Sequence, residues 1–200
     1  MKRKIITTGD GSKTIQIEGW DEQYHSKHGA VQEAYHVFIE HGLRLFQNEE
    51  VKLLEIGFGT GLNALITLME APKQQLSVDY VGVEAFPVSM EEVGALDYCL
   101  QLEAEVHQAD FQKMHSSPWE ETVSITPGFS LLKQQKDFKE IDEQNSFNLI
   151  YFDAFGARVQ PELWTEGVFL KTYQALRQNG VLVTYAAKGS VRRAMQAVGF

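Results

Sequence analysis

Residues 53–63 carry the strongest structural signal in the chain and read Leu53-Leu54-Glu55-Ile56-Gly57-Phe58-Gly59-Thr60-Gly61-Leu62-Asn63. An apolar run leads into a turn with three glycines, and an amphipathic segment begins directly after the turn. Because glycine has no Cβ, backbone N–H groups and the helix N-terminus can approach a polar cofactor closely in such a unit. The segment therefore predicts a cofactor site at the end of a buried strand.

The spacing of the glycines distinguishes between cofactors. The pattern is G-x-G-x-G, whereas the dinucleotide fingerprint is G-x-G-x-x-G and needs a glycine where Leu62 stands. This disfavours a nicotinamide cofactor. Glu55 places a carboxylate beside the turn, where its charge favours a cationic cofactor such as S-adenosylmethionine. The alternative is a glycine turn that serves only close packing of helix against strand.

Apolar and amphipathic segments alternate on both sides of this turn. We expect strands at 51–56, 78–83, 147–152 and 181–185, helices at 62–70, 89–98, 100–114, 166–176 and 190–198, and a hairpin of 123–126 with 129–132. A hairpin at 4–7 and 13–17 and an amphipathic helix at 30–46 precede them. The pattern is typical of a Rossmann-like α/β sheet, so we expect one domain with an extension at 1–50 and a core at 51–200.

Composition restricts the class of protein. The chain has 200 residues, 44% hydrophobic and 22% charged, as expected for one globular domain. No apolar run approaches the ~18 to 20 residues of a membrane helix, and no signal core follows the N-terminus, so we expect a cytoplasmic protein with no membrane partner. Cys99 is the single cysteine. No carboxylates accompany His25, His28, His36 and His41 at the spacing of a metal site, so we predict no metal.

The charge balance bears on nucleic-acid binding. Lysines and arginines number 18 and acidic residues 27, giving a net charge of −9, which argues against a broad nucleic-acid surface. Basic residues cluster at 2–4 and again at Lys188, Arg192 and Arg193. Each cluster is equally consistent with a local RNA contact and with a solvated charged face.

Two further acids are candidates for cofactor contacts. Glu84 follows the apolar run 78–83, where a carboxylate at the edge of a parallel sheet would accept hydrogen bonds from ribose hydroxyls. Asp137 could bind an adenine amino group, with Phe138 as an adjacent stacking face. Glu84 would also suit a dinucleotide enzyme, and Asp137 is equally typical of an exposed loop.

Asp153 ends the buried run 147–152 and is the candidate catalytic residue. A carboxylate at this edge can bind a protonated amine, orient it and assist its loss of a proton. The alternative is a helix N-cap, because a helical turn is expected from Pro161 onward.

Aromatic and basic residues near Asp153 are candidates for substrate contacts. Phe155 and Trp164 could sandwich a nucleobase, although Trp164 could equally belong to the core. Arg158 could contact phosphate or stack on a base, and Lys188 and Arg192 are grouped with it.

Several motifs together resemble the methyltransferase domain of tRNA 5-methylaminomethyl-2-thiouridine biosynthesis enzymes: residues 55–63, Phe152-Asp153-Ala154-Phe155, Pro161-Glu162-Leu163-Trp164 and Lys188-Gly189-Ser190-Val191-Arg192-Arg193. Tyr24-His25-Ser26, Gly29, Glu33 and Val37-Phe38 are similar to the N-terminal segment of that family. The resemblance implies a class I S-adenosylmethionine-dependent fold and methylation of the 5-aminomethyl group of wobble (2-thio)uridine in tRNA. It also implies Asp153 as the active-site aspartate and cofactor contacts from the glycine turn, including Phe58, Thr60 and Asn63, and from Glu84.

The chain departs from this family in three respects. Fused members carry a flavin-dependent oxidoreductase domain, for which 200 residues leave no room. We therefore expect a stand-alone methyltransferase that needs no flavin and receives its aminomethyl substrate from a separate oxidoreductase. The loop 156–160 differs from that of the fused enzymes. The sheet of the family ends with two further strands, so we expect a sequence truncated after Phe200.

Two other functions stay open. A small-molecule methyltransferase on the same fold would be indifferent to the acidic surface. A non-catalytic binding module could retain the fold for partner assembly, although the intact glycines and the intact Glu55 and Asp153 count against that alternative.

Overall fold

A six-stranded sheet forms the centre of the computed structural model, which describes residues 2–20, 22–26 and 28–200. Its strands are, in spatial order, β6 (Thr122–Thr126), β7 (Phe129–Gln134), β5 (Ser77–Val83), β4 (Glu50–Ile56), β8 (Phe147–Phe152) and β9 (Leu176–Thr184). β6 is antiparallel to β7, and every other neighbouring pair is parallel. The predicted Rossmann-like α/β class is confirmed.

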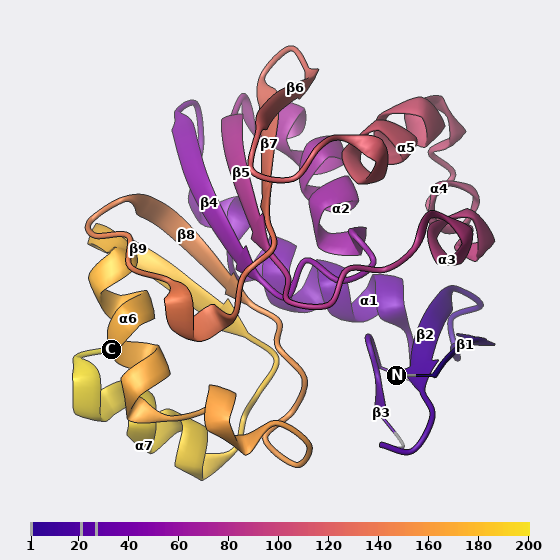
Figure 1. The fold of residues 1–200 in the computed structure, drawn as a ribbon. Helices are drawn as coiled ribbons and strands as arrows, with labels where there is room; N and C mark the ends of the chain where they lie inside the picture. The colour runs from indigo at the N-terminus through magenta and orange to yellow at the C-terminus, as the bar shows by residue number, and fades with distance from the viewer. Residues whose placement is uncertain (1, 21, 27) are drawn as a thin grey trace.

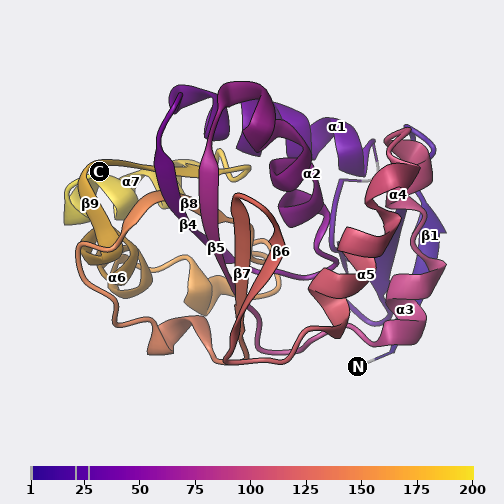
Figure 2. The same cartoon turned by 90° about the horizontal axis from the view of Figure 1, so that it is seen from above.

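Helices cover both faces of this sheet (Figures 1 and 2). One face carries α1 (Ala30–Ala34), α2 (Leu62–Glu70) and α5 (Gln108–Ser116), and the other carries α6 (Glu166–Ala175) and α7 (Gly189–Val198). Leu53 packs in the first layer and Leu54 in the second, because successive side chains of a strand point to opposite faces. The buried positions of the central strands are therefore mostly apolar on both faces, as is typical of parallel strands covered on both sides.

A second, smaller sheet lies beside α1 and α3 (Figure 1). It consists of β1 (Arg3–Thr7), β2 (Lys13–Ile17) and β3 (Glu22–Gln23), all antiparallel. The hairpin of β1 and β2 is the predicted one, whereas β3 was not expected. The small sheet brings the segment that follows β2 to the edge of the main sheet.

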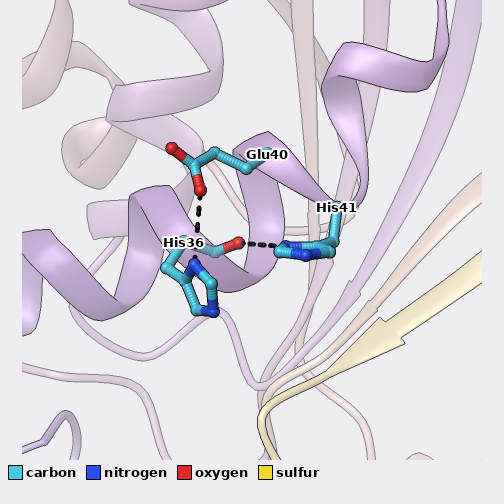
Figure 3. A group of neighbouring side chains, drawn as sticks. All are labelled: His36, Glu40 and His41. Atoms are coloured by element: carbon cyan, nitrogen blue, oxygen red, sulfur yellow. Dashed lines mark hydrogen bonds and ion pairs between the residues drawn. The ribbon is translucent and has the colours of Figure 1, made fainter.

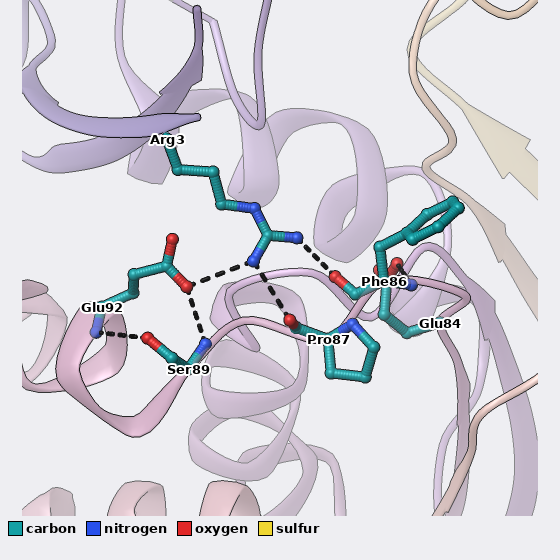
Figure 4. A network of polar contacts seen from close by, with 6 residues as sticks. All are labelled: Arg3, Glu84, Phe86, Pro87, Ser89 and Glu92. Atoms are coloured by element: carbon teal, nitrogen blue, oxygen red, sulfur yellow. Dashed lines mark hydrogen bonds and ion pairs between the residues drawn. The ribbon is translucent and has the colours of Figure 1, made fainter. Parts of the chain in front are cut away.

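Arg3 fastens the small sheet to the loop that follows β5 (Figure 4). Its guanidinium donates hydrogen bonds to the carbonyl oxygens of Phe86 and Pro87 and pairs with Glu92 at 3.2 Å. Glu92 also completes a capping box with Ser89 at the start of α3 (Met90–Ala95). One arginine thus joins β1, the loop after β5 and α3.

The predicted helices at 30–46 and 100–114 are interrupted in the structure. The first continues from α1 into a π-helical turn, η1 (Tyr35–Glu40), and Gly42 separates this turn from a 3-10 turn, η2 (Leu43–Leu45). The second divides into α4 (Tyr98–Gln101), η4 (Glu105–His107) and α5, because Glu103 adopts a left-handed φ of 51°. Three more 3-10 turns are η3 (Ala71–Gln74), η5 (Phe138–Glu140) and η6 (Pro161–Leu163).

The end of the core also differs from the expectation. α6 ends at Ala175, and β9 begins at the next residue, five positions before the predicted strand. Asn179, at a left-handed φ of 63°, and Gly180 therefore lie within β9 and do not stop the helix. Among the described residues, no helix has the length and apolar content needed to cross a lipid bilayer.

Candidate active site

A cavity of about 470 Å³ lies at the carboxyl edge of the main sheet, a volume typical of small-molecule sites. The glycine turn after β4 lines it, together with residues 84–86 after β5, 137–139 after β7 and Tyr185 after β9. Much of the loop after β8 and residues Trp20 and 22–26 of the small sheet complete the wall. The site is therefore assembled at the strand ends where the sequence predicted it.

The glycine turn needs its glycines for close approach to other backbone and ring atoms. Gly57 and Gly59 adopt φ values of 94° and 50° in the left-handed region. A Cβ on Gly57 would lie 2.6 Å from the carbonyl oxygen of Asp153, and one on Gly59 would lie 2.9 Å from the Tyr24 ring. The turn thus packs directly against the loop after β8 and against the small sheet.

Phe58 and Thr60 line the cavity, and Tyr98 and His115 contact them on the side away from it. The Phe58 ring packs against His115, with ring centroids 5.6 Å apart. Tyr98 donates a hydrogen bond to Thr60 Oγ1 at 3.0 Å, and His115 Nε2 donates to the carbonyl oxygen of Thr60 at 3.1 Å. Burial, aided by the charge of Lys133, lowers the pKa of His115 to about 4, so its imidazole is neutral at pH 7.

Asn63 connects the two carboxylates at the centre of the site. Its Nδ2 donates to Glu55 Oε1 at 2.8 Å and to Asp153 Oδ2 at 2.9 Å. Tyr80 donates to the other oxygen of Glu55 at 2.8 Å. Within the described residues, the buried Oδ1 of Asn63 has no hydrogen-bond partner, so an acceptor is left for a ligand.

Both of these carboxylates have raised pKa values. Burial raises the pKa of Glu55 well above its usual value, and the charge of Asp153 adds to the effect. Burial and then the charge of Glu33 raise the pKa of Asp153 to about 8. A cation in the cavity would favour the ionised form of both groups.

Asp153 has contacts that suit a site residue. Its backbone N–H donates to the carbonyl oxygen of Ile56 at 2.9 Å, and its carboxylate accepts a hydrogen bond from the Asn63 amide. Gln160 occupies the N-cap of η6 and Thr165 that of α6. The alternative role of Asp153 as a helix N-cap is therefore wrong.

Glu84 and Asp137 both line the cavity, on the side of β5 and β7. Glu84 accepts hydrogen bonds from the backbone N–H groups of Gly59 and Phe86 at 3.0 and 2.9 Å, and burial raises its pKa. Asp137 is exposed and accepts a hydrogen bond from the backbone N–H of Lys139 at the start of η5. The contacts of these two acids with a cofactor stay predictions.

The aromatic residues near Asp153 need a correction. Trp164 is 6% exposed and packs against Phe152 and Tyr185, while its indole N–H donates to the carbonyl oxygen of Phe155 at 2.8 Å. Trp164 is thus a core residue that fixes the loop, and the predicted base sandwich with Phe155 does not form.

Two aromatic residues to which the sequence analysis assigned no site role lie beside Phe155. Tyr24 and Trp20 meet its ring edge to face, with centroids 4.9 and 6.0 Å away. They flank β3, before and after it, and both line the cavity. Tyr24 belongs to the Tyr24-His25-Ser26 motif of the resemblance, but only the tertiary fold brings residues 20–24 to the loop after β8.

The predicted basic residues do not gather at the cavity. Arg158 donates to the carbonyl oxygen of Trp20 at 3.0 Å and pairs with Glu22 at 2.9 Å, so it holds the small sheet against the loop. Lys188 and Arg192 are exposed around the first turn of α7 and do not line the cavity. Their contacts with RNA stay predictions.

The histidines of the N-terminal helical segment form a surface cluster (Figure 3). His36 Nδ1 lies 3.2 Å from Glu40 Oε2, and His41 donates to the carbonyl oxygen of His36 at 2.7 Å. Donor atoms of the three side chains lie within 4.8 Å of one another, and all three residues are exposed and outside the cavity lining. His25 is instead buried beside Thr14.

The lining of the cavity is strongly acidic. Lys139 is the one lysine that lines it, and no arginine does so, within the described residues. The carboxylates are Glu22, Glu33, Glu55, Glu84, Asp137, Asp153 and Glu162. This donor set, with the unpartnered Asn63 oxygen, fits S-adenosylmethionine, which carries a sulfonium and an ammonium group.

Comparisons with known proteins agree with this geometry. The family model described as S-adenosyl-L-methionine-dependent methyltransferase matches residues 101–200. The tRNA 5-methylaminomethyl-2-thiouridine biosynthesis bifunctional protein MnmC of Hydrogenovibrio crunogenus is 25% identical over 216 residues, which cover 100% of this chain and 31% of that relative. The chain therefore spans less than a third of the length of that protein.

Solved structures share the fold. MnmC2 from Aquifex aeolicus superposes with a TM-score of 0.73 at 24% identity, covering 100% of this chain and 64% of the other. Spermidine synthase from Thermotoga maritima superposes with a TM-score of 0.60 at 16% identity, covering 98% of this chain and 60% of the other. The chain belongs to the S-adenosyl-L-methionine-dependent methyltransferase family and is an MnmC methyltransferase-domain-like protein.

Proposed function

We propose that this methyltransferase acts in the cytoplasm on the 5-aminomethyl group of (2-thio)uridine at the wobble position of tRNA. The observation that carries the proposal is the acidic cavity that Asp153 lines, which suits an acceptor that arrives as a protonated amine. The name of the Hydrogenovibrio relative, which refers to tRNA 5-methylaminomethyl-2-thiouridine biosynthesis, supports the same substrate.

The order of strands suggests how cofactor and acceptor share the cavity. The glycine turn after β4 lies in the middle, the ends of β5 and β7 contribute Glu84 and Asp137 on one side, and β8 and β9 contribute Asp153 and Tyr185 on the other. We assign the first side to the nucleoside of S-adenosylmethionine and the second to the acceptor. When bound, S-adenosylmethionine supplies a methyl group activated by a positively charged sulfur.

Asp153 has two tasks in this scheme. Its carboxylate binds and orients the acceptor ammonium, and it then takes a proton so that the nitrogen lone pair becomes available. A carboxylate whose pKa is raised to about 8 by burial and by the charge of Glu33 is a far stronger base than an exposed aspartate. Asn63 fixes the position of this carboxylate, and Phe155 offers a ring against which the flipped base can stack.

The basic residues outside the cavity are assigned to the remainder of the tRNA. Arg158, Lys188 and Arg192 are exposed and belong to the loops or helix that follow β8 and β9. We propose that they contact phosphates near the wobble position and that a separate oxidoreductase supplies the aminomethyl substrate.

The test is transfer of labelled methyl from S-adenosylmethionine to bulk tRNA from a strain that lacks this activity, followed by nucleoside analysis. We expect label in 5-methylaminomethyl uridines with the wild-type protein and none with Asp153→Asn. Cofactor binding without any transfer to tRNA would refute the tRNA assignment.

A small primary amine is the second candidate acceptor. The net charge of −9 and the excess of carboxylates over basic residues in the cavity favour it, because neither feature helps to attract a polyanion. Labelled transfer to small amines without tRNA, at rates that exceed transfer to tRNA, would establish this function instead.

A further inference from the structure

We propose that Glu33, on the N-terminal helix α1, is the second carboxylate that binds the ammonium group of the acceptor, opposite Asp153. The inference rests on the proposed function and adds a residue from the N-terminal extension to the substrate site. It also names the chemical property that the site selects, which is a positive charge on the group to be methylated.

Glu33 and Asp153 belong to the same end of the cavity. Both line it, together with Tyr185. Tyr185 donates a hydrogen bond to the carbonyl oxygen of Ala154; burial raises its pKa, and the charges of Asp153, Glu22 and Glu33 raise it further. The charges of these acids therefore act on the same part of the cavity, near the loop after β8, although the acids belong to α1, to β3 and to the position directly after β8.

Burial raises the pKa of Glu33 and the charge of the exposed His28 lowers it, but among the described residues no lysine or arginine neutralises this pair of acids. Within residues 2–20, 22–26 and 28–200, neither Glu33 nor Asp153 forms an ion pair with lysine or arginine. By contrast, Glu22 of the same wall pairs with Arg158. Carboxylates withdrawn from water are normally paired, so two unpaired ones at one end of a cavity indicate a cationic ligand.

The two carboxylates differ in the partners that hold them. Glu33 Oε1 accepts a hydrogen bond from the backbone N–H of Ser26 at 3.0 Å, and Asp153 accepts one from the Asn63 amide. Burial raises the pKa of both groups, and the charge of Glu33 raises that of Asp153 further, to about 8, so Asp153 is the group that takes a proton. Glu33 then keeps its charge beside the nitrogen while Asp153 holds the proton.

This division of roles accounts for the need for two acids. A primary ammonium has three N–H donors, so one carboxylate cannot fix its direction alone. After Asp153 has taken a proton, Glu33 still holds the amine in place, and it stabilises the charge that reappears on the methylated nitrogen. An acceptor with a hydroxyl in place of the amine can donate one hydrogen bond but gains no attraction between opposite charges from either acid.

The test compares binding of two nucleosides, 5-aminomethyluridine and 5-hydroxymethyluridine, in the presence of S-adenosylhomocysteine. We expect calorimetry to show that the wild-type protein prefers the aminomethyl nucleoside and that Glu33→Gln reduces this preference by about 10-fold or more, the loss expected for a hydrogen bond between charged groups. Glu33→Asp keeps the charge and should retain part of the preference. Glu40→Gln, at the exposed last residue of η1 and outside the cavity lining, is the matched control.

Activity provides a second readout that a purely structural role of Glu33 would not change. Removing the negative charge of Glu33 lowers the pKa of Asp153, so the acid limb of kcat/KM for the acceptor should move to lower pH in Glu33→Gln. KM for the acceptor should rise while the affinity for S-adenosylmethionine changes little.

The outcomes separate the two proposals. If the wild-type protein methylates tRNA but Glu33→Gln keeps its nucleoside preference and its pH profile, the role of Glu33 is overturned and the proposed function stands. If the wild-type protein neither methylates tRNA nor distinguishes the two nucleosides, both proposals fail.

Discussion

The carboxylate of Glu84 accepts a hydrogen bond from the backbone N–H of Gly59 at 3.0 Å, so the residue that follows β5 also orders the turn that follows β4. The other oxygen of Glu84 accepts from Phe86, whose carbonyl is in turn held by Arg3. The proposed nucleoside side of the cavity is therefore one connected unit of two strand ends and a strand of the small sheet.

Replacing Glu84 by alanine should weaken binding of S-adenosylmethionine by roughly 1 to 3 kcal/mol, because a buried charged acceptor is lost. Turnover at saturating cofactor should fall much less. Calorimetric titration with the cofactor measures the first quantity, and Glu91→Ala, at an exposed position of α3, is the control. A large loss of turnover with unchanged affinity would contradict the assignment of Glu84 to the cofactor.

Asp153→Ala should retain cofactor binding and lower turnover by ~10² or more, the scale of a lost acid/base and orienting group. Equilibrium binding and single-turnover methyl transfer distinguish the two effects. Asn63→Ala should lower turnover less than Asp153→Ala does, because Asn63 positions Asp153 and does not itself take the proton. If Asp153→Ala abolishes cofactor binding as well, Asp153 is structural.

The stability of the ligand-free protein should depend on the ionisation of Asp153. Its pKa rises from 3.8 to about 8 on folding, so the stability that this group contributes is fully present below pH 3.8 and is lost as pH rises toward about 8. The Asp153→Asn variant does not lose this stability, because asparagine does not ionise. The difference in Tm between variant and wild type should therefore grow with pH across this interval and then level off, whereas a constant difference would exclude the raised pKa.

Replacing a glycine by alanine should lower the free energy of unfolding most where the added Cβ would clash with neighbouring atoms. At Gly57 the Cβ would lie 2.6 Å from a backbone oxygen of Asp153, and φ is 94°, so we expect a loss of about 1 to 2 kcal/mol from the left-handed backbone and more from the clash. Gly94→Ala, in α3 with no atom within 4 Å of the new Cβ, should be neutral or stabilising by about 0.5 to 1 kcal/mol. Thermal denaturation of both variants tests the contrast.

Alanine variants of Trp164 and Phe155 should differ in their effects, the first acting mainly on stability and the second mainly on tRNA binding. Trp164→Ala should lower the free energy of unfolding by about 3 to 5 kcal/mol, because Trp164 is only 6% exposed and packs in the core. Phe155→Ala should change stability less and should mainly raise KM for tRNA. Urea denaturation and steady-state kinetics give the two quantities, and equal effects of the two variants on KM would restore a stacking role for Trp164.

Local sequence was sufficient where the structure depends on neighbouring residues. α2 has the predicted bounds, because the glycines fix where it begins and its apolar spacing fixes its extent. β4 and β5 begin one residue earlier than predicted. Asp153 and Glu84 were found for the same reason, since the end of a parallel strand marks the edge at which ligands bind.

Local sequence was insufficient where distant segments meet. The resemblance includes Glu33 without a role, and its place in an amphipathic helix does not show that it lines the cavity. Trp164 was ambiguous for the opposite reason, because an aromatic residue near a site looks the same in sequence whether it faces the core or the ligand. The left-handed Glu103, which ends α4, has no glycine or asparagine to signal it.

The contact between Arg158 and Glu22 joins residues 136 positions apart. Contacts of such wide separation close slowly during folding, because the chain entropy lost in forming the loop must be overcome first. The wall of the cavity around β3 is consequently complete only when these two distant segments have met. In a refolding experiment, secondary structure should therefore recover before the capacity to bind S-adenosylmethionine, and the ligand can stabilise the finished domain but cannot guide its early collapse.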